Sequence, residues 1–413
     1  MKNRPHIAVV SPFLDKSFGT ERMVVEWISH LADEFEIDIY SQRIQDLDLS
    51  KVTWHRIPKI SGPHLLNFIW WFAANHVWRA WDRRFHGLRF DLVYTPGINC
   101  FDADAITIHI VFAEYVRRLQ SELRFMRNSP VSWPRLLHRR LYYRLLILLE
   151  ARIYTNPLTQ LILTSKRTAK ELEGFYGRHD LFPVICAGLD HKIFNPARRA
   201  FLREEARNKL GLADSRFTIL LIGNDWRKKG LMALLDALVL LSELPISLLV
   251  ASRESASAHR LLFRDKELSD RVVFLSPRPD VEFYYAAADA YVGPSLEDTF
   301  ALPVAEAMAC GLPVIISARA GASDIVAHGV DGLILQDPTD ARALASMVRQ
   351  LYEDPALRAR LGGRAAETAG LLTWERSSRE IAAIFQDILT KSQDGGADNG
   401  LGTLPRGSHT RTT

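Results

Sequence analysis

Short apolar runs alternate with helical patterns along this chain, and the alternation occurs in both halves. The apolar runs are residues 7–10, 36–40, 91–95, 105–111 and 161–165 in the first half, and residues 218–223, 246–252, 271–275, 290–295 and 312–317 in the second half. Strands separated by helices are typical of a parallel, doubly wound sheet. We therefore predict an α/β chain that contains two similar Rossmann-like sheets.

The length of 413 residues exceeds what one hydrophobic core usually supports, so two domains are expected. A segment with Pro and Gly at turn positions, residues 182–199, is the predicted connector. This sets the domain boundaries at residues 1–190 and 191–370. Ligands bind beyond the carboxyl ends of the strands in such sheets, so two facing sheets would form a cleft at their junction. The Gly-rich, polar residues 392–413 predict a disordered tail.

The three cysteines, Cys100, Cys186 and Cys310, are isolated from one another and from histidines at metal-ligand spacing. Neither a disulfide framework nor a zinc site is expected from this pattern. The apolar run near the N-terminus has four residues, far fewer than the apolar core of a signal peptide. These features favour a reducing, cytoplasmic setting.

Basic and aromatic side chains are concentrated in the first half. Residues 51–152 hold 16 Lys and Arg against 7 Asp and Glu, and residues 64–90 contain four Trp. Indole rings beside cations suit the surface of an anionic membrane, so peripheral docking through residues 64–152 is one hypothesis. The alternative is a pair of helices packed on the first sheet with a solvated Arg face. Nucleic acid is not an expected partner, because the region contains no recognisable binding module.

Residues 293–315, GPSLEDTFALPVAEAMACGLPVI, predict the end of a strand, a loop, a helix and the next strand. This arrangement brings the carboxylates of Asp298 and Glu306 near the N-terminus of the helix. Backbone N–H groups at Phe300, Ala301 and Leu302 would face an anionic ligand there, and a diphosphate is the expected anion. The alternative is an ordinary αβ unit with solvated acids.

A second segment, residues 220–238, predicts a strand, a glycine turn, a basic cluster and an amphipathic helix. The cluster contains Arg227, Lys228 and Lys229. Cations at such a turn can follow the charge that develops on a departing diphosphate. A solvated basic loop that precedes a helix is the alternative interpretation.

These two segments resemble the signature of the retaining glycosyltransferases of family 4, also called glycosyl transferases group 1. The resemblance implies the GT-B fold, in which two Rossmann-like domains face a central cleft. It gives Glu306 a contact with the donor ribose and Asp298 a contact with the donor sugar, with Glu297 as a neighbour. Asp298 replaces the usual Glu, and Ala301 replaces a Gly that gives the backbone more freedom.

The resemblance implies further roles in substrate binding. Lys229 matches a family lysine, whereas Asn224 occupies the position of a family arginine, so Arg227 or Lys228 would replace that cation. Gly19 keeps one of two family glycines, and His109 matches a histidine close to the transferred sugar. A structural glycine and a core histidine are the respective alternatives. The remaining contacts implied by the signature are Thr299, Phe300, Ala301 and Leu302.

The implied function is transfer of a sugar from a UDP- or GDP-sugar to a glycan or lipid-linked acceptor, with retention of the anomeric configuration. Residues 1–190 would bind the acceptor, residues 191–370 would bind the donor, and residues 371–391 would form a helix that returns to the first domain. No cofactor or metal is implied, and the DAD sequence at residues 102–104 is interpreted as a solvated turn. Synthesis of a cell-envelope polysaccharide or glycolipid, at the inner face of the membrane, is the expected context. A nucleotide-sugar epimerase and a non-catalytic membrane scaffold on the same fold remain alternatives.

Overall fold

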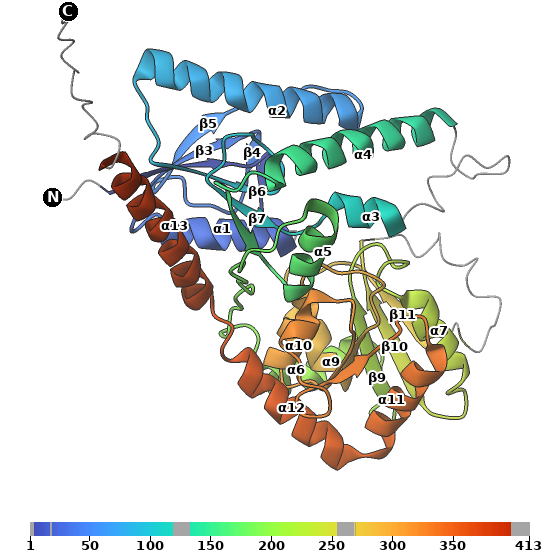
Figure 1. Ribbon diagram of the computed structural model, residues 1–413. Helices are drawn as coiled ribbons and strands as arrows, with labels where there is room; N and C mark the ends of the chain where they lie inside the picture. Colours follow the sequence, from blue (N-terminus) through green and yellow to red (C-terminus); the bar gives the residue numbers. More distant parts are fainter. Residues whose placement is uncertain (1–3, 17–18, 119–132, 254–267, 269, 398–413) are drawn as a thin grey trace, which may run out of the picture.

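The structure is a computed structural model that describes residues 4–16, 19–118, 133–253, 268 and 270–397. These residues form two α/β domains, with the N-terminal domain above the C-terminal domain in Figure 1. Each domain has a six-stranded sheet in which all pairings between neighbouring strands are parallel. The prediction of two doubly wound parallel sheets is confirmed.

The first sheet has the strand order β5-β3-β1-β6-β7-β8. Its strands are β1 (His6–Val10), β3 (Glu36–Ser41), β5 (Thr53–Arg56), β6 (Leu92–Pro96), β7 (Ala105–Ile108) and β8 (Gln160–Leu163). A separate short pair, β2 (Phe13–Leu14) and β4 (Arg43–Ile44), follows the ends of β1 and β3. Successive strands are added on one side of β1 up to β5 and on the other side from β6 onward, so the strand order reverses between β1 and β6. Polar groups beyond the carboxyl ends of these two strands are candidates for ligand binding.

The second sheet repeats this topology with the order β11-β10-β9-β12-β13-β14. Its strands are β9 (Phe217–Ile222), β10 (Ile246–Ala251), β11 (Val272–Leu275), β12 (Ala290–Gly293), β13 (Val314–Ser317) and β14 (Leu333–Leu335). The corresponding reversal lies between β9 and β12. Both sequence segments singled out above follow these two strands.

Helices cover both faces of each sheet. The helices of the N-terminal domain are α1 (Gly19–Leu31), α2 (His64–Trp81), the π-helix η1 (Asp82–His86), α3 (Phe112–Arg118), α4 (Trp133–Tyr154) and α5 (Lys166–Tyr176). The following segments are α6 (Pro196–Lys209), α7 (Leu231–Val239), α9 (Glu282–Ala287), α10 (Leu302–Ala309), the 3₁₀-helix η4 (Gly321–Asp324), α11 (Ala341–Glu353), α12 (Pro355–Ala369) and α13 (Trp374–Ala397). None of the helices in the described part of the chain is long and apolar enough to cross a bilayer.

Side-chain alternation along β1 explains how the first sheet is covered on both faces. Ile7 and Val9 pack in one cluster with residues of α1 and α13, whereas Ala8 and Val10 pack in another cluster with residues of α2 and α4. Successive side chains of a strand point to opposite faces, so β1 contributes to both clusters. The first sheet is therefore a central layer between two helical layers.

Two edge strands, β5 and β14, were not predicted. Residues 53–56 read TWHR, which has neither an apolar run nor a clear alternation, and β5 is only partly buried. Residues 333–335 form a strand of three residues, too short to give a periodic signal. Both segments adopt the strand conformation because they pair with a neighbouring strand of the sheet, and the local sequence gives no sign of this pairing.

The C-terminal helix α13 returns to the N-terminal domain. Its Ser377 hydroxyl accepts a hydrogen bond from the indole of Trp27 in α1 at 3.0 Å, and Phe385 contacts Phe35 edge-on at 6.2 Å between ring centroids. The helix continues to Ala397, so the predicted start of a disordered tail at residue 392 is wrong. Residues 392–397 read SQDGGA, and the two glycines in this segment gave no indication that the helix continues. Residues 398–413 lie outside the described residues.

Candidate active site between the two domains

A cavity of about 200 Å³ lies where the carboxyl ends of strands from both domains meet. The C-terminal domain contributes residues that follow β9, β12 and β13, and the N-terminal domain contributes residues from the end of β7 and from α3 and α5. The lining residues are His109, Ile110, Tyr115, Ser165, Arg167, Thr168, Glu171, Asn224, Asp225, Lys228, Lys229, Glu297, Asp298, Thr299 and Arg319. Seven of the residues singled out in the sequence therefore line one cavity: His109, Asn224, Lys228, Lys229, Glu297, Asp298 and Thr299.

The basic turn after β9 is fixed by close backbone packing. Gly230 has a φ of 75°, and a Cβ added there would lie 1.9 Å from the carbonyl oxygen of Pro294. The N–H of Leu296 also donates to the carbonyl of Lys228 at 2.7 Å. The turn after β9 and the loop after β12 are thus held together, and only glycine fits at position 230.

Lys229 forms an ion pair with Asp298, which joins the two C-terminal segments by side chains as well. Lys228 instead reaches across to the N-terminal domain, where its ammonium donates to the Tyr115 hydroxyl at 2.8 Å. Burial opposes the charge of Lys228, but the hydrogen bonds to Tyr115 and Asp225 outweigh it and raise the pKa of Lys228. Both lysines are therefore cations in the cavity wall.

The other residues of the basic turn have different environments. The Arg227 side chain is exposed and is not part of the cavity wall. Asn224 does line the cavity, and its side-chain oxygen accepts the N–H of Arg253 at 2.9 Å. Two arginines that the sequence did not single out, Arg167 of α5 and Arg319 after β13, are in the wall instead. Arg167 donates to the carbonyl of Arg319 at 2.8 Å, across the domain junction.

Carboxylates from both domains also line this cavity. Glu297 is 3.5 Å from the guanidinium of Arg118, and Glu171 is 3.4 Å from it. Burial raises the pKa of Glu297, and burial with the nearby acids raises the pKa of Glu171 to about 7. This part of the wall can accept hydrogen bonds from hydroxyl groups.

The loop before α10 has an unusual backbone. Ala301 precedes the helix with φ 66° and ψ 60°, in the left-handed region that glycine prefers. Phe300 and Ala301 are buried and lie behind the cavity wall. Leu302 begins α10 and meets the start of α1, where a Cβ added to Gly19 would lie 4.0 Å from the Leu302 Cβ. Gly19 is thus the first residue of a helix at the domain junction.

Glu306 lies one turn further along α10, away from the cavity wall. Its carboxylate accepts a hydrogen bond from the Tyr285 hydroxyl at 2.7 Å and from Arg22 of α1 at 3.2 Å. Burial raises the pKa of Glu306, and Arg22 opposes this shift. The contact joins the two domains directly, because Arg22 belongs to the N-terminal domain.

His109 directly follows β7, as the sequence predicts for its position at a strand end. Its Nε2 atom is inaccessible to solvent and has no hydrogen-bond partner among the described residues. Burial lowers the pKa of His109 to about 4, so the imidazole is neutral at pH 7. A neutral ring with an unsatisfied nitrogen can bind a hydroxyl group of a ligand.

A second and larger cavity, of about 550 Å³, adjoins the first one and is lined mostly by residues of the N-terminal domain. The two cavities share His109, Ile110 and Thr299 in their walls. The larger cavity lies beyond the carboxyl ends of β1 and β6, where Ser11 and residues 96–99 line it. It thus occupies the position of strand reversal in the first sheet.

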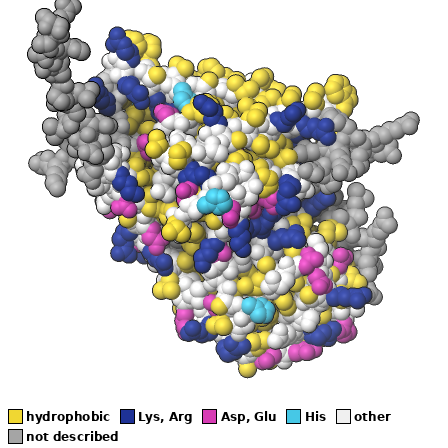
Figure 2. Space-filling model, viewed as in Figure 1, with side chains coloured by type: hydrophobic (Ala, Val, Ile, Leu, Met, Phe, Trp, Pro, Cys, Tyr) yellow, Lys and Arg dark blue, Asp and Glu magenta, His cyan; other side chains and the backbone are white. Residues whose placement is uncertain are grey.

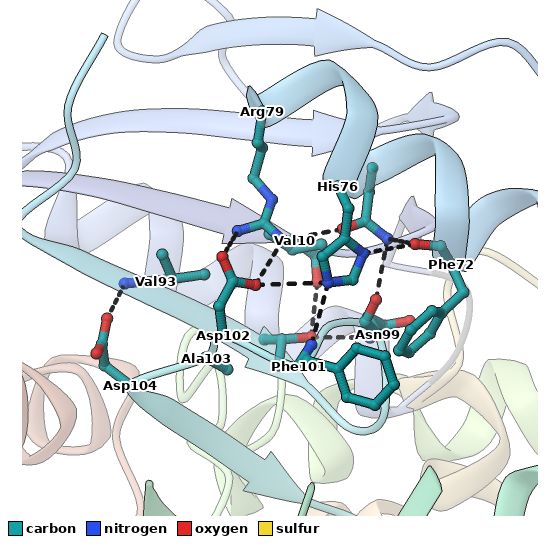
Figure 3. A network of polar contacts seen from close by, with 12 residues as sticks. Val10, Phe72, His76, Arg79, Val93, Asn99, Phe101, Asp102, Ala103 and Asp104 are labelled. Atoms are coloured by element: carbon teal, nitrogen blue, oxygen red, sulfur yellow. Dashed lines mark hydrogen bonds and ion pairs between the residues drawn. The ribbon is translucent and has the colours of Figure 1, made fainter. Parts of the chain in front are cut away.

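Asp102 is exposed, as expected for a solvated turn, but the acidic residues 102–104 also have structural contacts. Figure 3 shows Asp102 facing Arg79 and His76 of α2. Arg79 donates two hydrogen bonds to Asp102, at 2.7 and 2.8 Å, and the Asp104 carboxylate accepts the Val93 N–H at 2.7 Å. The segment anchors α2 to the sheet. The described ranges contain no group of three or more His, Cys, Asp or Glu that could hold a metal ion.

Residues 202–368 match the family model for glycosyl transferases group 1. The D-inositol 3-phosphate glycosyltransferase of Corynebacterium urealyticum is 30% identical over 261 residues, which are 60% of this chain and 61% of that protein. The protein of the same name from Pseudarthrobacter chlorophenolicus is 32% identical over 229 residues, 53% of each chain. This chain thus spans between about half and three fifths of the length of these relatives.

Solved structures with the same fold match nearly the whole chain. WaaG, a glycosyltransferase involved in lipopolysaccharide biosynthesis, matches with a TM-score of 0.70 at 19% identity, over 92% of this chain and 99% of WaaG. Sucrose-phosphate synthase from Thermosynechococcus elongatus matches with a TM-score of 0.71 at 22% identity, over 94% and 100% of the chains. HepE from Anabaena in complex with UDP-glucose gives 0.67 at 19% identity, over 92% and 99%. The chain therefore has the predicted two-domain GT-B fold, and its residues 202–368 belong to the glycosyl transferases group 1 family.

Proposed function

We propose that this protein is a glycosyltransferase that moves a sugar from a nucleotide-sugar donor to an acceptor held by the N-terminal domain. The observation that supports this most directly is the cavity between the domains, where Lys228, Lys229 and Arg319 face the carboxylates of Glu297 and Asp298. Cations suit the diphosphate of the donor, and carboxylates suit the hydroxyl groups of its sugar.

In the reaction, the bond between the anomeric carbon and the diphosphate oxygen breaks, and a bond to an acceptor oxygen forms. The sugar gains positive charge and the diphosphate gains negative charge, while the acceptor hydroxyl gives up its proton to the departing diphosphate. Stabilising the developing negative charge is the largest task, and cations fixed before the reaction do it best. Lys229 and Lys228 have this role in our proposal, because both are held in the wall by carboxylate or phenol partners.

The sugar would lie between Asp298 and His109, which line the same cavity from opposite domains. Glu306 would contact the ribose, as the family resemblance implies. In the structure Arg22 and Tyr285 bind the Glu306 carboxylate, so a ribose hydroxyl would replace Arg22 or share an oxygen with it. In the first case, a shift of Arg22 would accompany donor binding.

A UDP-sugar is the donor that we favour. HepE, which has the same fold, was solved in complex with UDP-glucose. We further propose that transfer retains the anomeric configuration and needs no metal. NMR of the product's anomeric proton tests the first point, and unchanged turnover in EDTA tests the second.

The decisive experiment is calorimetric titration of the protein with UDP, GDP, ADP and their sugar conjugates. We expect one nucleotide to bind selectively, and Lys229→Ala and Glu306→Ala to weaken it at least tenfold. Lys209→Ala is the matched control, because that lysine is exposed on α6, where it pairs with Glu205 and lies over the Phe283 ring, away from the cavity between the domains. A folded protein that binds none of these nucleotides would rule out the transferase.

We also propose that the N-terminal domain docks on an anionic membrane surface, at the inner face of the cell membrane, to reach a glycan or glycolipid of the envelope. Figure 2 shows hydrophobic and basic side chains mixed along the edge formed by α2 and α4. Large exposed apolar side chains on these helices and on η1 are Leu66, Ile69, Val77, Trp81, Phe85, Trp133, Leu137, Leu141 and Leu148. Apolar side chains beside arginines suit the headgroup region of a bilayer. The part of this region in residues 119–132 lies outside the described residues.

Sedimentation with lipid vesicles tests the docking surface. We expect binding to phosphatidylglycerol vesicles, little binding to phosphatidylcholine vesicles, and loss of binding in Trp81→Ser combined with Leu141→Ser. The control is Leu240→Ser with Leu371→Ser, two exposed leucines of the C-terminal half. Equal sedimentation of both double variants would contradict the docking surface.

A further inference from the structure

The side chains that line the larger cavity, of about 550 Å³, indicate which class of ligand it can bind. Aromatic and aliphatic side chains from α2 and α4 form much of the wall, including Phe68, Trp71, Tyr142 and Leu146. Phe68 and Tyr142 meet edge-on with 5.9 Å between their ring centroids, so the two helices are joined beside the cavity. Such walls bind apolar chains and the apolar faces of sugar rings.

Two buried polar atoms in this wall have no hydrogen-bond partner. They are the Oδ1 of Asn67 and the Nε2 of His109. The other end of the Asn67 amide donates to the carbonyl of Gly62 at 2.8 Å, which fixes the amide so that Oδ1 is the free end. A buried polar atom without a partner is costly, so a ligand that supplies hydroxyl donors would bind favourably there.

Charge in the wall disfavours an anionic ligand. Burial raises the pKa of Glu21, and this acid lines the same cavity. In the part of the wall that the structure describes, the cationic side chain Lys59 and the neighbouring His64 are both exposed. His109 is neutral because burial lowers its pKa to about 4. An anion deep in this cavity would lose its hydration without gaining a buried cation.

We propose that this cavity binds an uncharged glycoside with an apolar aglycone, and that this is the acceptor of the proposed transferase. The acceptor sugar lies against His109 and Thr299, which also line the cavity between the domains. One sugar hydroxyl binds the Nε2 of His109, and another donates to the Oδ1 of Asn67. The aglycone lies against the aromatic rings of α2 and α4. This acceptor differs from D-inositol 3-phosphate, the phosphorylated compound for which the relatives are named.

Tryptophan fluorescence tests the inference without any donor, because Trp71 lines the cavity. Three compounds are titrated: octyl β-D-glucopyranoside below its micelle concentration, methyl β-D-glucopyranoside and D-inositol 3-phosphate. We expect the octyl glucoside to bind at least tenfold more tightly than the other two. Trp71→Phe should remove most of the fluorescence change.

Variants separate the hydrogen bond from general packing. Asn67→Leu should weaken octyl glucoside binding at least fivefold, whereas Asn67→Asp, which keeps an acceptor oxygen, should weaken it less. Asn208→Leu, at an exposed position of α6, is the control and should have no effect. Equal binding by Asn67→Leu and the control would contradict the role of Asn67.

The outcomes also distinguish this inference from the proposed function on which it rests. Tighter binding of the inositol phosphate, lost in Lys59→Ala, would overturn the inference and leave the transferase intact if UDP still binds. Octyl glucoside binding by a protein that binds no nucleotide would overturn the assignment of the glycoside as an acceptor. Binding of both the glucoside and one nucleotide, each sensitive to its own variants, supports both.

Discussion

Ala301 holds a backbone conformation that an L-residue adopts at a cost. At its φ of 66°, the Ala301 Cβ lies close to the backbone, and this conformation costs about 1 kcal/mol more for alanine than for glycine. Ala301→Gly should therefore increase the free energy of unfolding by roughly 0.5 to 1 kcal/mol in urea denaturation. Ala359→Gly, at an exposed position inside α12, should instead decrease it by about 1 kcal/mol. A loss of stability in both variants would show that Ala301 is not strained.

The buried His109 predicts a dependence of stability on pH. Its pKa is about 4 in the folded protein against 6.5 for the ordinary group, so the folded state binds fewer protons between these values. Above about pH 6.5, His109 is neutral in both the folded and the unfolded state, and it does not lower the free energy of unfolding. As the pH falls toward 4, the unfolded state gains a proton that the folded state does not, so the free energy of unfolding decreases. Relative to His109→Gln, the wild-type protein should lose about 3 kcal/mol between pH 7 and pH 4 in urea denaturation. Parallel pH profiles of the two proteins would contradict this prediction.

Single residues of the site were predictable where local sequence places them at a strand end. Lys228, Lys229 and Asp298 follow β9 and β12, and the sequence shows both strands. Tyr115 and Arg319 were missed, because each reaches the cavity through packing between distant segments. Arg227 carries the right charge in the right turn, yet its side chain is exposed, since the direction of a turn residue is not evident from its spacing.

At the scale of elements, the turn between β9 and α7 depends on the absence of a side chain at one position. Gly230→Ala would place a methyl group 1.9 Å from the Pro294 oxygen, in addition to the strain of φ 75°. Gly211 is a matched control, because its φ is 64° but nothing lies within 4 Å of an added Cβ. We expect Gly230→Ala to lower the free energy of unfolding by at least about 2 kcal/mol more than Gly211→Ala does. Similar losses in thermal or urea unfolding would show that the close approach does not constrain the turn.

The central strands of both sheets and the edge strands β8 and β11 were predictable, whereas the edge strands β5 and β14 were not. β9 and β10 are six-residue apolar strands buried almost throughout, as expected between two helical layers. β5 is half-buried and polar, and its register comes from pairing with β3. The last turns of α13 escaped prediction because Gly395 and Gly396 suggested a break.

At the scale of the whole molecule, a helix from the end of the chain completes the core of the first domain. Phe385 of α13 is 1% exposed and lies 5.3 Å from the ring of Tyr94 in β6, measured between centroids. Phe385→Ala should therefore lower the free energy of unfolding by about 3 to 5 kcal/mol. Leu371→Ala, at a side chain that is 64% exposed, should change it by less than about 0.5 kcal/mol. Comparable effects of the two substitutions on chemical denaturation would contradict the docking of α13.

The sequence predicted that a cleft lies between the two domains, but not the contacts that join them. The sequence indicates that both sheets end at a common junction, but not which side chains cross it. Arg22 to Glu306 and Lys228 to Tyr115 join residues 284 and 113 positions apart in the chain. Such pairs depend on the angle between two folded bodies, which no local pattern specifies.

The return of α13 means that the polypeptide passes between the domains twice. The two passages lie side by side, since the N–H of Leu189 donates to the carbonyl of Leu372 at 3.0 Å and a Cβ on Gly188 would meet the backbone of Trp374 at 2.4 Å. Bending the two paired segments together would keep the hydrogen bond between them. Twisting one domain against the other would break it, because the segments would slide past each other. We therefore expect the cleft to open and close mainly by rotation about one axis, with the two walls of the cavity keeping the same alignment.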